Sequence, residues 1–304
     1  MHVVVAIVGF RNAGDISQCL NALGASRHTD IEVVICENGG PEAFDLLVAK
    51  LPINLPGGQG VRAILAPKNL GYAGGVNVCL AETPQADAWW VLNPDTLPEP
   101  GALEGLVARL AQGDCDAVGC TVYLPNNRIQ SYGGQWRPWS ARTISLGLGE
   151  ALDKPIDALA VERDQTYLNG ASMLMSRRFV EAVGPMRQDY FLYCEEVEWC
   201  QRGLNRGMRL GFSAQGRVFH NQGSTTGAGG GLRQRARTPV YLSERNLILV
   251  TRDCFPRRLP AAALAALARL FVQYVRQGGS RQLVYGLGGW WAGLRGERGV
   301  PLWI

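Results

Sequence analysis

"WWVLNPDTLPEP" (residues 89–100) joins an apolar run to a polar turn, and the fold can be worked out from it in both directions. Residues 89–92 have the composition of a buried strand, and Pro94 cannot continue the hydrogen-bond ladder of a sheet. Asp95 therefore lies where a buried strand ends. Such an aspartate is commonly a turn former or the N-cap of a following helix. The alternative is a carboxylate that serves a ligand, and the neighbouring segments favour it.

Strands and helices alternate on both sides of this stretch. We expect strands at residues 3–10, 31–36, 61–66, 89–92 and 116–123, and helices at residues 14–23, 74–82 and 101–112. This order predicts an α/β fold with a mainly parallel sheet flanked by helices. Ligands of such sheets bind beyond the carboxyl ends of the strands.

Polar clusters follow three of the expected strands, at Phe10–Asn12, Glu37–Gly40 and Asn93–Asp95. A further segment, "NLGYAGGVN" (Asn69–Asn77), has glycines that let the backbone approach a ligand, and the N-terminus of the following helix favours an anion. A turn that needs glycine for packing would look the same. The segment lacks the GxGxxG spacing, and the chain has no Walker GK[ST] motif. By itself it is a weak phosphate loop.

Three carboxylates lie in "YFLYCEEVEWC" (residues 190–200). On a helix, Glu195 and Glu198 share a face, whereas Glu196 points elsewhere. Carboxylates in a first helical turn favour the helix dipole, so capping alone could explain one or two of them. The aromatic residues before them would raise the pKa of a nearby carboxyl group towards values useful to a general base. Spacing alone leaves the identity of the base open.

His220 ends an expected strand and opens onto a glycine-rich, then basic segment at residues 223–238. A lone histidine is more often structural, but an imidazole here could complete an oxygen-rich divalent metal site with Asp95. The segment itself has nothing apolar enough to anchor it, and we predict a mobile loop.

Composition indicates a globular cytoplasmic protein. A chain of 304 residues with 47% hydrophobic residues can form one large α/β domain or two smaller ones. Its eight cysteines show no paired short spacing and are typical of reduced thiols in a cytosolic protein. We expect no signal peptide, because an apolar strand directly follows Met1, and no stretch of the uncharged length that a membrane span needs.

Positive charge is concentrated late in the chain. Residues 201–304 contain sixteen arginines, no lysine and three acidic residues, a net +13, whereas the whole chain has +4 and the first 200 residues therefore −9. A basic half suits a polyanionic partner, such as a phosphate-bearing ligand or an anionic membrane surface, although a solvated basic face is equally consistent. No nucleic-acid recognition motif accompanies the arginines, so we expect no nucleic-acid partner.

These segments occur in an order that resembles the family 2 inverting glycosyltransferases of the GT-A fold. The similarity is greatest to the bacterial rhamnosyltransferase branch, which builds the cell-surface polysaccharide of the cell envelope. The resemblance covers residues 1–250. We expect residues 251–304 to form a C-terminal helical, membrane-peripheral segment. The matching pieces are "FRN" (10–12), "CENGG" (36–40), "NLGYAGGVN" (69–77), "LNPDT" (92–96), "NGASMLMSRRFVEAVGPM" (169–186), "FLYCEEVEWCQR" (191–202), "VFHNQGS" (218–224), "YLSERNLILV" (241–250) and "GLRGERG" (293–299).

The resemblance implies roles for individual residues. Asp95 and His220 would hold Mg²⁺ or Mn²⁺, Glu196 would be the base that activates the acceptor, and Glu195 would orient the acceptor. Two departures from the family pattern are Asn93, in place of the first acid of Asp-x-Asp, and Glu196, in place of an aspartate. The residues implied in nucleotide-sugar binding are Phe10, Arg11, Asn12, Glu37, Asn38, Asn69, Gly71, Tyr72, Gly74, Gly75, Asn77, Asn93 and Asp95.

The implied reaction moves a sugar from a nucleotide-diphosphate donor, with dTDP-rhamnose as the expected donor, to a hydroxyl group of a saccharide or lipid-linked acceptor. The expected location is the cytoplasm, with peripheral contact to the inner face of the plasma membrane. One alternative is a sugar-1-phosphate nucleotidyltransferase, but the loop after the first strand offers only Arg11. Another is an inactive nucleotide- or polysaccharide-binding module, which Asn93 favours and the retained Glu195, Glu196 and His220 do not.

Overall fold

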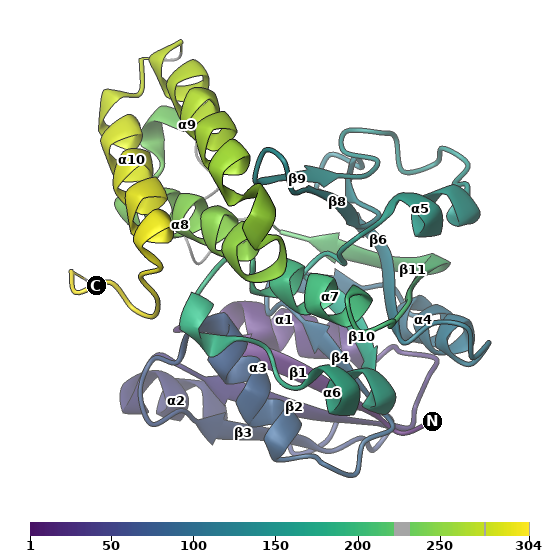
Figure 1. Ribbon diagram of the computed structural model, residues 1–304. Coiled ribbons are helices and arrows are strands. Elements are labelled where there is room, and N and C mark those ends of the chain that lie inside the picture. The colour runs from purple at the N-terminus through teal and green to yellow at the C-terminus, as the bar shows by residue number, and fades with distance from the viewer. Residues whose placement is uncertain (222–231, 277, 304) are drawn as a thin grey trace.

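The computed structural model describes residues 1–221, 232–276 and 278–303 (Figure 1). Residues 223–231 of the expected mobile loop lie outside the described residues. The expected loop ends earlier than the sequence suggests, because residues 232–234 form a 3₁₀ turn and a helix begins at Arg237.

The central sheet is mixed but mainly parallel, which confirms the expected fold class. Within the described residues it has nine strands, ordered β3-β2-β1-β4-β10-β6-β11-β5, with β7 paired to β6. β10 runs antiparallel to both of its neighbours, and β5 antiparallel to β11. The strands are β1 (Val3–Gly9), β2 (Ile31–Glu37), β3 (Val61–Leu65), β4 (Ala88–Leu92), β5 (Thr96–Pro98), β6 (Ala117–Tyr123), β7 (Ile129–Ser131), β10 (Ser172–Ser176) and β11 (Leu210–His220).

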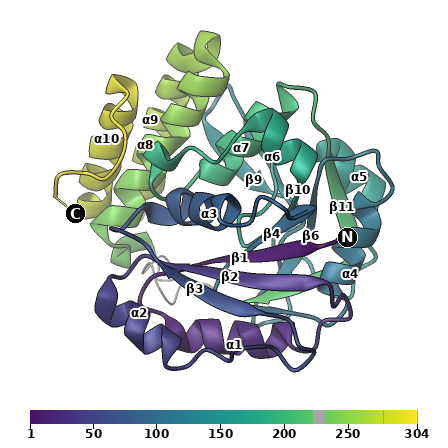
Figure 2. The same ribbon diagram turned by 90° about the horizontal axis from the view of Figure 1, so that it is seen from below.

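Helices cover both faces of the sheet, and the alternation of side chains along β1 shows why (Figure 2). Val4, Ala6 and Val8 contribute to the hydrophobic cluster shared with α3, α6 and α7, whereas Val5 and Ile7 contribute to the one shared with α1, α2 and α4. These helices are α1 (Ala13–Leu23), α2 (Pro41–Val48), α3 (Gly71–Ala81), α4 (Ala102–Leu110), α6 (Arg177–Val183) and α7 (Glu195–Leu204). A strand buried on both faces must be apolar throughout, as β1 is.

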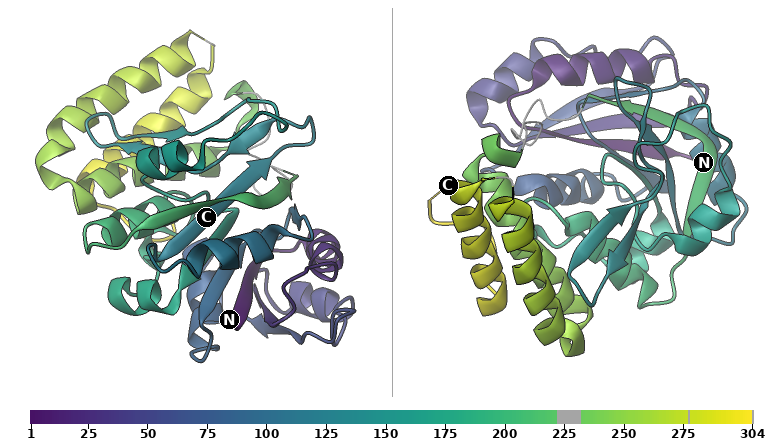
Figure 3. Two further views of the ribbon diagram at one scale, coloured as in Figure 1. Left: turned by 90° about the vertical axis from the view of Figure 1, so that its right-hand side faces the viewer. Right: turned by 90° about the horizontal axis from the view of Figure 1, so that it is seen from above.

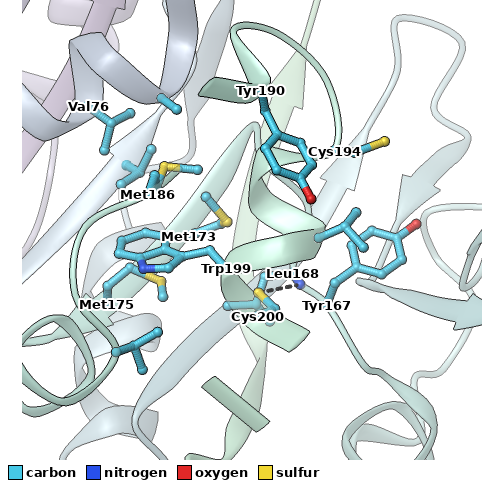
Figure 4. Close-up of a cluster of buried hydrophobic side chains, with 14 of the residues drawn as sticks. Val76, Tyr167, Leu168, Met173, Met175, Met186, Tyr190, Cys194, Trp199 and Cys200 are labelled. Atoms are coloured by element: carbon cyan, nitrogen blue, oxygen red, sulfur yellow. Dashed lines mark hydrogen bonds between the residues drawn. The ribbon is translucent and has the colours of Figure 1, made fainter. Parts of the chain in front are cut away.

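The apolar face of α7 is fixed by a dense cluster of aromatic and sulfur-containing side chains (Figure 4). The Trp199 indole donates to the carbonyl of Gly184 at 2.8 Å and meets the Phe179 ring edge-on. The Leu168 N–H donates to Cys200 Sγ at 3.5 Å. Since α7 begins at Glu195, this packing holds the candidate carboxylates in place.

The helices α9 (Leu259–Val275) and α10 (Ser280–Arg295) form a pair that extends away from the central sheet (Figure 3). α8 (Arg237–Cys254) packs on α7, and α9 and α10 pack on α8 and on each other. α8 continues without a break across residue 250, so the division into residues 1–250 and 251–304 stays a prediction. A short sheet of β8 (Gly134–Arg137) and β9 (Arg142–Ser145), with α5 (Ala158–Asp164), completes the chain.

The expectation that no stretch is long enough to span a membrane was too strict. Residues Pro256–Val275 form a 20-residue helical stretch with mean hydropathy 1.2, which by length and composition could cross a membrane. An uncharged stretch of spanning length was not expected here because Arg269 and Arg276 lie on this apolar helix.

Candidate active site

A pocket of about 680 Å³ lies at the carboxyl ends of the parallel strands. It is lined by residues that follow β1, β2, β4 and β11, together with the first turns of α3 and α7. The expected residues that line it are Phe10, Asn12, Asn38, Asn69, Gly71, Tyr72, Asn93, Asp95, Glu195, Glu196 and His220. Residues far apart in the sequence therefore meet where the sheet topology requires a ligand site.

Asp95 and His220 form a close pair on one wall of the pocket. β5 pairs antiparallel with β11 in a register that sets His220 beside Thr96, so the side chain of Asp95 reaches the imidazole. His220 Nε2 lies 3.2 Å from Asp95 Oδ1, and His220 Nδ1 lies 2.7 Å from Gln130 Oε1 on β7. Because Gln130 Oε1 can only accept, the proton is on Nδ1 and Nε2 faces the carboxylate.

The chemistry of this pair fits a divalent metal ion. A carboxylate oxygen and an imidazole nitrogen are suitable ligands, and Gln130 orients the imidazole through the other ring nitrogen, as an outer-shell partner of a metal-bound histidine does. Within the described ranges no group of three or more His, Cys, Asp or Glu side chains could hold a metal ion. Since Mg²⁺ is commonly held by one or two carboxylates together with substrate phosphates, a bound diphosphate would complete the site.

Glu195 and Glu196, in the first turn of α7, line the same pocket and differ in exposure. Glu195 is 4% exposed, and its Oε2 has no hydrogen-bond partner among the described residues. Burial raises the pKa of Glu195 well above its usual value, and the neighbouring Glu196 adds to this effect. Burial also raises the pKa of Glu196, to about 7, while the N–H groups of Glu196 and Val197 lower it. Glu196 remains partly exposed, so it is the carboxyl group better placed to receive a proton.

Glu198 has a structural role. Both of its oxygens accept hydrogen bonds from Arg202, at 2.8 and 3.0 Å, and it is 2% exposed. The three carboxylates of the first turn of α7 therefore separate into one ion-paired group and two groups at the pocket. The sequence left this choice open.

Tyr72 lies within the electrostatic influence of Glu195, Glu196 and Asp95. Its hydroxyl donates to the carbonyl of Gly170 at 2.8 Å, and a Cβ at Gly170 would stand 3.4 Å from Glu196 Cγ. Burial raises the pKa of the Tyr72 phenol, and the negative charges of Glu195, Glu196 and Asp95 raise it further. The phenol thus stays protonated as a donor within the field of all three carboxylates.

The segment that precedes α7 has an unusual backbone. Phe191, Tyr193 and Cys194 have φ angles of 68°, 74° and 65°, in a backbone region that residues other than glycine rarely adopt. Gly71 allows the close approach of this segment, because a Cβ there would stand 2.1 Å from the Phe191 carbonyl oxygen. The Tyr72 N–H donates to that oxygen at 2.9 Å.

Two buried residues of α8 hold this segment from the other side. Asn246 Nδ2 donates to the carbonyls of Tyr190, Leu192 and Tyr193 at 3.0, 2.8 and 2.8 Å. Arg245 donates to the Tyr190 carbonyl at 2.9 Å and to Asn246 Oδ1 at 2.9 Å. Tertiary hydrogen bonds therefore impose the backbone conformation that aims the first turn of α7 at the pocket.

Asn38 and Asn69, two of the residues expected to bind the nucleotide, make hydrogen bonds to the backbone at the start of α3. Asn38 Nδ2 donates to the Gly71 carbonyl at 2.9 Å, and Asn38 Oδ1 accepts from the Leu70 N–H at 3.2 Å. Asn69 Oδ1 accepts from the Gly71 N–H at 3.0 Å. Their amides support the turn that begins α3, so both residues shape the pocket wall that they line.

Arg11 and Glu37 lie behind the pocket. Glu37 is fully buried, and its Oε1 accepts from the N–H groups of Arg11 and Gly39 at 3.1 and 2.7 Å. Arg11 has a φ of 58°, and its Nε donates to the Gly39 carbonyl at 3.2 Å. These contacts fix the two loops after β1 and β2, and a direct role of either residue in nucleotide binding stays a prediction.

Gly74, Gly75 and Asn77 also lie outside the pocket lining. A Cβ at Gly75 would stand 2.6 Å from Val8 Cγ1, so this glycine allows α3 to pack closely on β1. The Asn77 amide exchanges two hydrogen bonds with the backbone of Met186, at 2.8 and 2.9 Å. Their observed contacts are structural, and their place in nucleotide binding likewise stays a prediction.

Sequence reasoning missed several residues of the site. Gln130 lies on a three-residue strand with no pattern of its own. Tyr167 lines the pocket beside Glu196 from an irregular segment. Arg245 and Asn246 are within "YLSERNLILV", which carried part of the resemblance without a role, so that motif was the available signal.

Comparison with known proteins identifies the fold and the family. Residues 4–184 match the family described as Glycosyl transferase family 2. The mannosyltransferase PcManGT from Pyrobaculum calidifontis, solved in complex with GDP-Man and Mn²⁺, has a TM-score of 0.57 and 14% sequence identity, over 96% of this chain and 87% of that one. The fold is GT-A, as the resemblance implied.

Two curated relatives are distant in sequence. An N-acetylglucosaminyl-diphospho-decaprenol L-rhamnosyltransferase of Mycobacterium tuberculosis is 22% identical over 264 residues, which are 80% of this chain and 84% of that protein. A low-salt glycan biosynthesis hexosyltransferase of Haloferax volcanii is 26% identical over 121 residues, or 38% of this chain, and the match spans about a third (35%) of that protein.

Proposed function

The chain belongs to glycosyl transferase family 2 and is a glycosyltransferase. On this basis we propose that it transfers L-rhamnose from dTDP-rhamnose with inversion of configuration at the anomeric carbon. The proposed acceptor is a hydroxyl group of a saccharide on a lipid diphosphate. The observation that carries the proposal is one pocket with a proton acceptor, Glu196, and a candidate metal pair, Asp95 and His220. The distant rhamnosyltransferase relative supports the choice of sugar and acceptor.

The proposed step is a direct displacement. The acceptor oxygen forms a bond to the anomeric carbon while the bond from that carbon to the diphosphate oxygen breaks, and the electron pair leaves with the diphosphate. The acceptor proton moves to the carboxylate of Glu196, whose pKa of about 7 makes it an effective base near neutral pH. Glu195 is buried, which raises its pKa well above the usual value, and its role in this proposal is to support the acceptor side of the pocket.

Asp95 and His220 would hold Mg²⁺ or Mn²⁺, and Gln130 would keep the histidine oriented towards it. When bound, the ion supplies Lewis-acid neutralisation of the charge that develops on the leaving diphosphate. Asn93 removes one carboxylate from the usual pair, so metal affinity without the donor should be weak.

A screen of nucleotide sugars for thermal stabilisation, with and without Mn²⁺, tests the proposal directly. We expect dTDP-rhamnose to raise the melting temperature most, and the shift to grow with Mn²⁺ because ligand binding to the folded state stabilises it by mass action. Asp95→Ala should lose the Mn²⁺-dependent part of the shift and at least about a hundredfold in turnover. The matched control is Asp45→Ala, an exposed aspartate on α2, which should behave as wild type.

The released product separates this proposal from its rivals. Transfer to an acceptor releases a nucleoside diphosphate, whereas a nucleotidyltransferase acting on the same donor exchanges pyrophosphate. Wild-type turnover of Asp95→Ala would contradict the role of Asp95. Binding of a donor without turnover on any lipid-linked or free saccharide would favour the inactive binding module.

A further inference from the structure

The outward face of α9 is apolar along its whole length. Leu264 is 69% exposed, Phe271 46% and Val275 60%, and their spacing sets them on one side of the helix. The inward face, with Ala266, Leu270 and Tyr274 among others, is buried against the rest of the fold. A helix with an apolar inner face and an apolar outer face needs a second partner for the outer one.

The single charged residue of α9 does not interrupt this face. Arg269 points back into the fold, where it donates to Glu244 at 3.0 Å and to the carbonyls of Ser140 and Ala141 at 2.9 and 3.1 Å. The sequence between Leu259 and Val275 contains no other charged residue. The outer surface of the helix is therefore free of charge over 17 residues.

Arginines stand at both ends of the apolar face. Arg257 precedes α9 at one end, and the exposed side chains of Arg276 and Arg281 follow its last residue at the other. Residues 256–296 contain six arginines and no acidic residue. Arg258 Cζ lies 5.0 Å from the centroid of the Trp139 ring, which is 64% exposed, and tryptophan is an aromatic residue typical of a membrane interface.

We propose that α9 docks on the surface of an anionic lipid bilayer, with its outer face in the headgroup region and with Arg257, Arg276 and Arg281 on lipid phosphates. This inference is independent of the reaction proposed above. A charge-free apolar stripe bordered by cations is the pattern of a helix that lies in the membrane interface. A second copy of the chain is a poorer partner, because a symmetric contact would bring two acid-free, arginine-bearing surfaces together.

The same contacts argue that α9 lies on the membrane and does not cross it. The stretch Pro256–Val275 is 28% buried in the fold, and crossing would remove Arg269 from Glu244 and from the two carbonyls that it binds. Glu244 is itself buried, so its loss of the arginine would leave an uncompensated acid. Docking leaves all of these contacts intact.

Flotation of the full-length chain with vesicles tests the proposal. We expect binding to phosphatidylcholine vesicles that contain about one-third phosphatidylglycerol, weakening as NaCl rises, and little binding to pure phosphatidylcholine. Phe271→Ser/Val275→Ser should lower the partition coefficient at least about tenfold by removing apolar area. Arg276→Glu/Arg281→Glu should lower it at least about tenfold by reversing charge at the C-terminal end of α9.

Matched variants elsewhere on the surface control for general effects. Ile53→Ser/Leu159→Ser removes two apolar side chains that are 87% and 79% exposed, and Arg27→Glu/Lys50→Glu makes the same change in net charge as the arginine pair. Both controls should bind as wild type, and circular dichroism melting verifies that every variant is folded.

Three results would overturn the proposal. The first is salt-insensitive binding to neutral vesicles, which would exclude recognition of anionic lipid. The second is equal loss of binding in the control variants. The third is absence of vesicle binding together with a dimer in light scattering that Phe271→Ser/Val275→Ser dissociates, which would make a second copy the partner of α9.

Discussion

At the residue scale, Glu195 and Glu196 differ in their access to the pocket, and catalysis should follow that difference. Glu196→Gln should lower turnover by about 10² to 10⁴, the usual cost of losing a general base, while the affinity for the donor is preserved. Glu195→Gln replaces a buried carboxyl group with an amide of the same shape, so it should act mainly on acceptor affinity. Steady-state turnover and donor titration of both variants measure the two effects.

The pH dependence of kcat/KM tests the assignment of Glu196 independently. Protonated Glu196 cannot accept the acceptor proton, so kcat/KM of the wild type should rise with pH through about 7, the raised pKa of Glu196. That rise should be missing from the residual activity of Glu196→Gln. An inactive Glu195→Gln beside an active Glu196→Gln would reverse the assignment and leave the mechanism possible.

Much of this site could be predicted from residue types and their positions, but the sequence did not show which of two adjacent carboxylates acts as the base. Strand-end position brought out Asp95, Asn38 and His220, because strand order dictates which loops meet. The choice between Glu195 and Glu196 depended on the φ angles of residues 191–194 and on how far each carboxyl group is buried, and neither is encoded in local spacing.

At the element scale, α8 supports the active site through Asn246. We expect Asn246→Ala to lower kcat more than it alters donor affinity, because the three carbonyls that lose their donor belong to the segment before α7. Unsatisfied buried carbonyls should also lower the free energy of unfolding by about 1–3 kcal/mol. Turnover and donor binding measured well below the melting temperature separate positioning from unfolding.

Asn205→Ala is the matched control, since Asn205 is an exposed residue just after α7. Equal losses of kcat and donor affinity in Asn246→Ala would indicate a general structural defect and contradict the positioning role.

Elements with strong periodicity were predictable, and elements defined by contact were not. The structure confirms the strands and helices that apolar patterning predicted in the first 123 residues, whereas α2 and β5 were not expected. The clamp of α8 on the 190–194 segment joins residues more than 50 positions apart, so its effect exists only once the fold brings them together.

At the scale of the whole molecule, Arg269 connects two helices of the last third with each other and with the small β8–β9 sheet. Glu244 on α8 and Arg269 on α9 meet at 3.0 Å, and Arg269 also binds the turn between β8 and β9 through the carbonyls of Ser140 and Ala141. Burial raises the pKa of Glu244, and the charge and hydrogen bond of Arg269 lower it. Three parts of the fold therefore depend on a single guanidinium group.

Arg269→Ala should lower the free energy of unfolding by about 3 kcal/mol near neutral pH, because it leaves a buried carboxylate unpaired. Without the arginine, the folded pKa of Glu244 rises further above its unfolded value. A group with a raised folded pKa loses stability as pH rises through that pKa, so the defect should shrink on acidification, when Glu244 becomes neutral. Urea unfolding at about pH 5 and about pH 8 measures the difference.

The double variant Glu244→Gln/Arg269→Met removes both charges and should recover part of the loss at the higher pH. A defect of equal size at both pH values, unrelieved in the double variant, would assign the effect to lost packing and not to the buried charge.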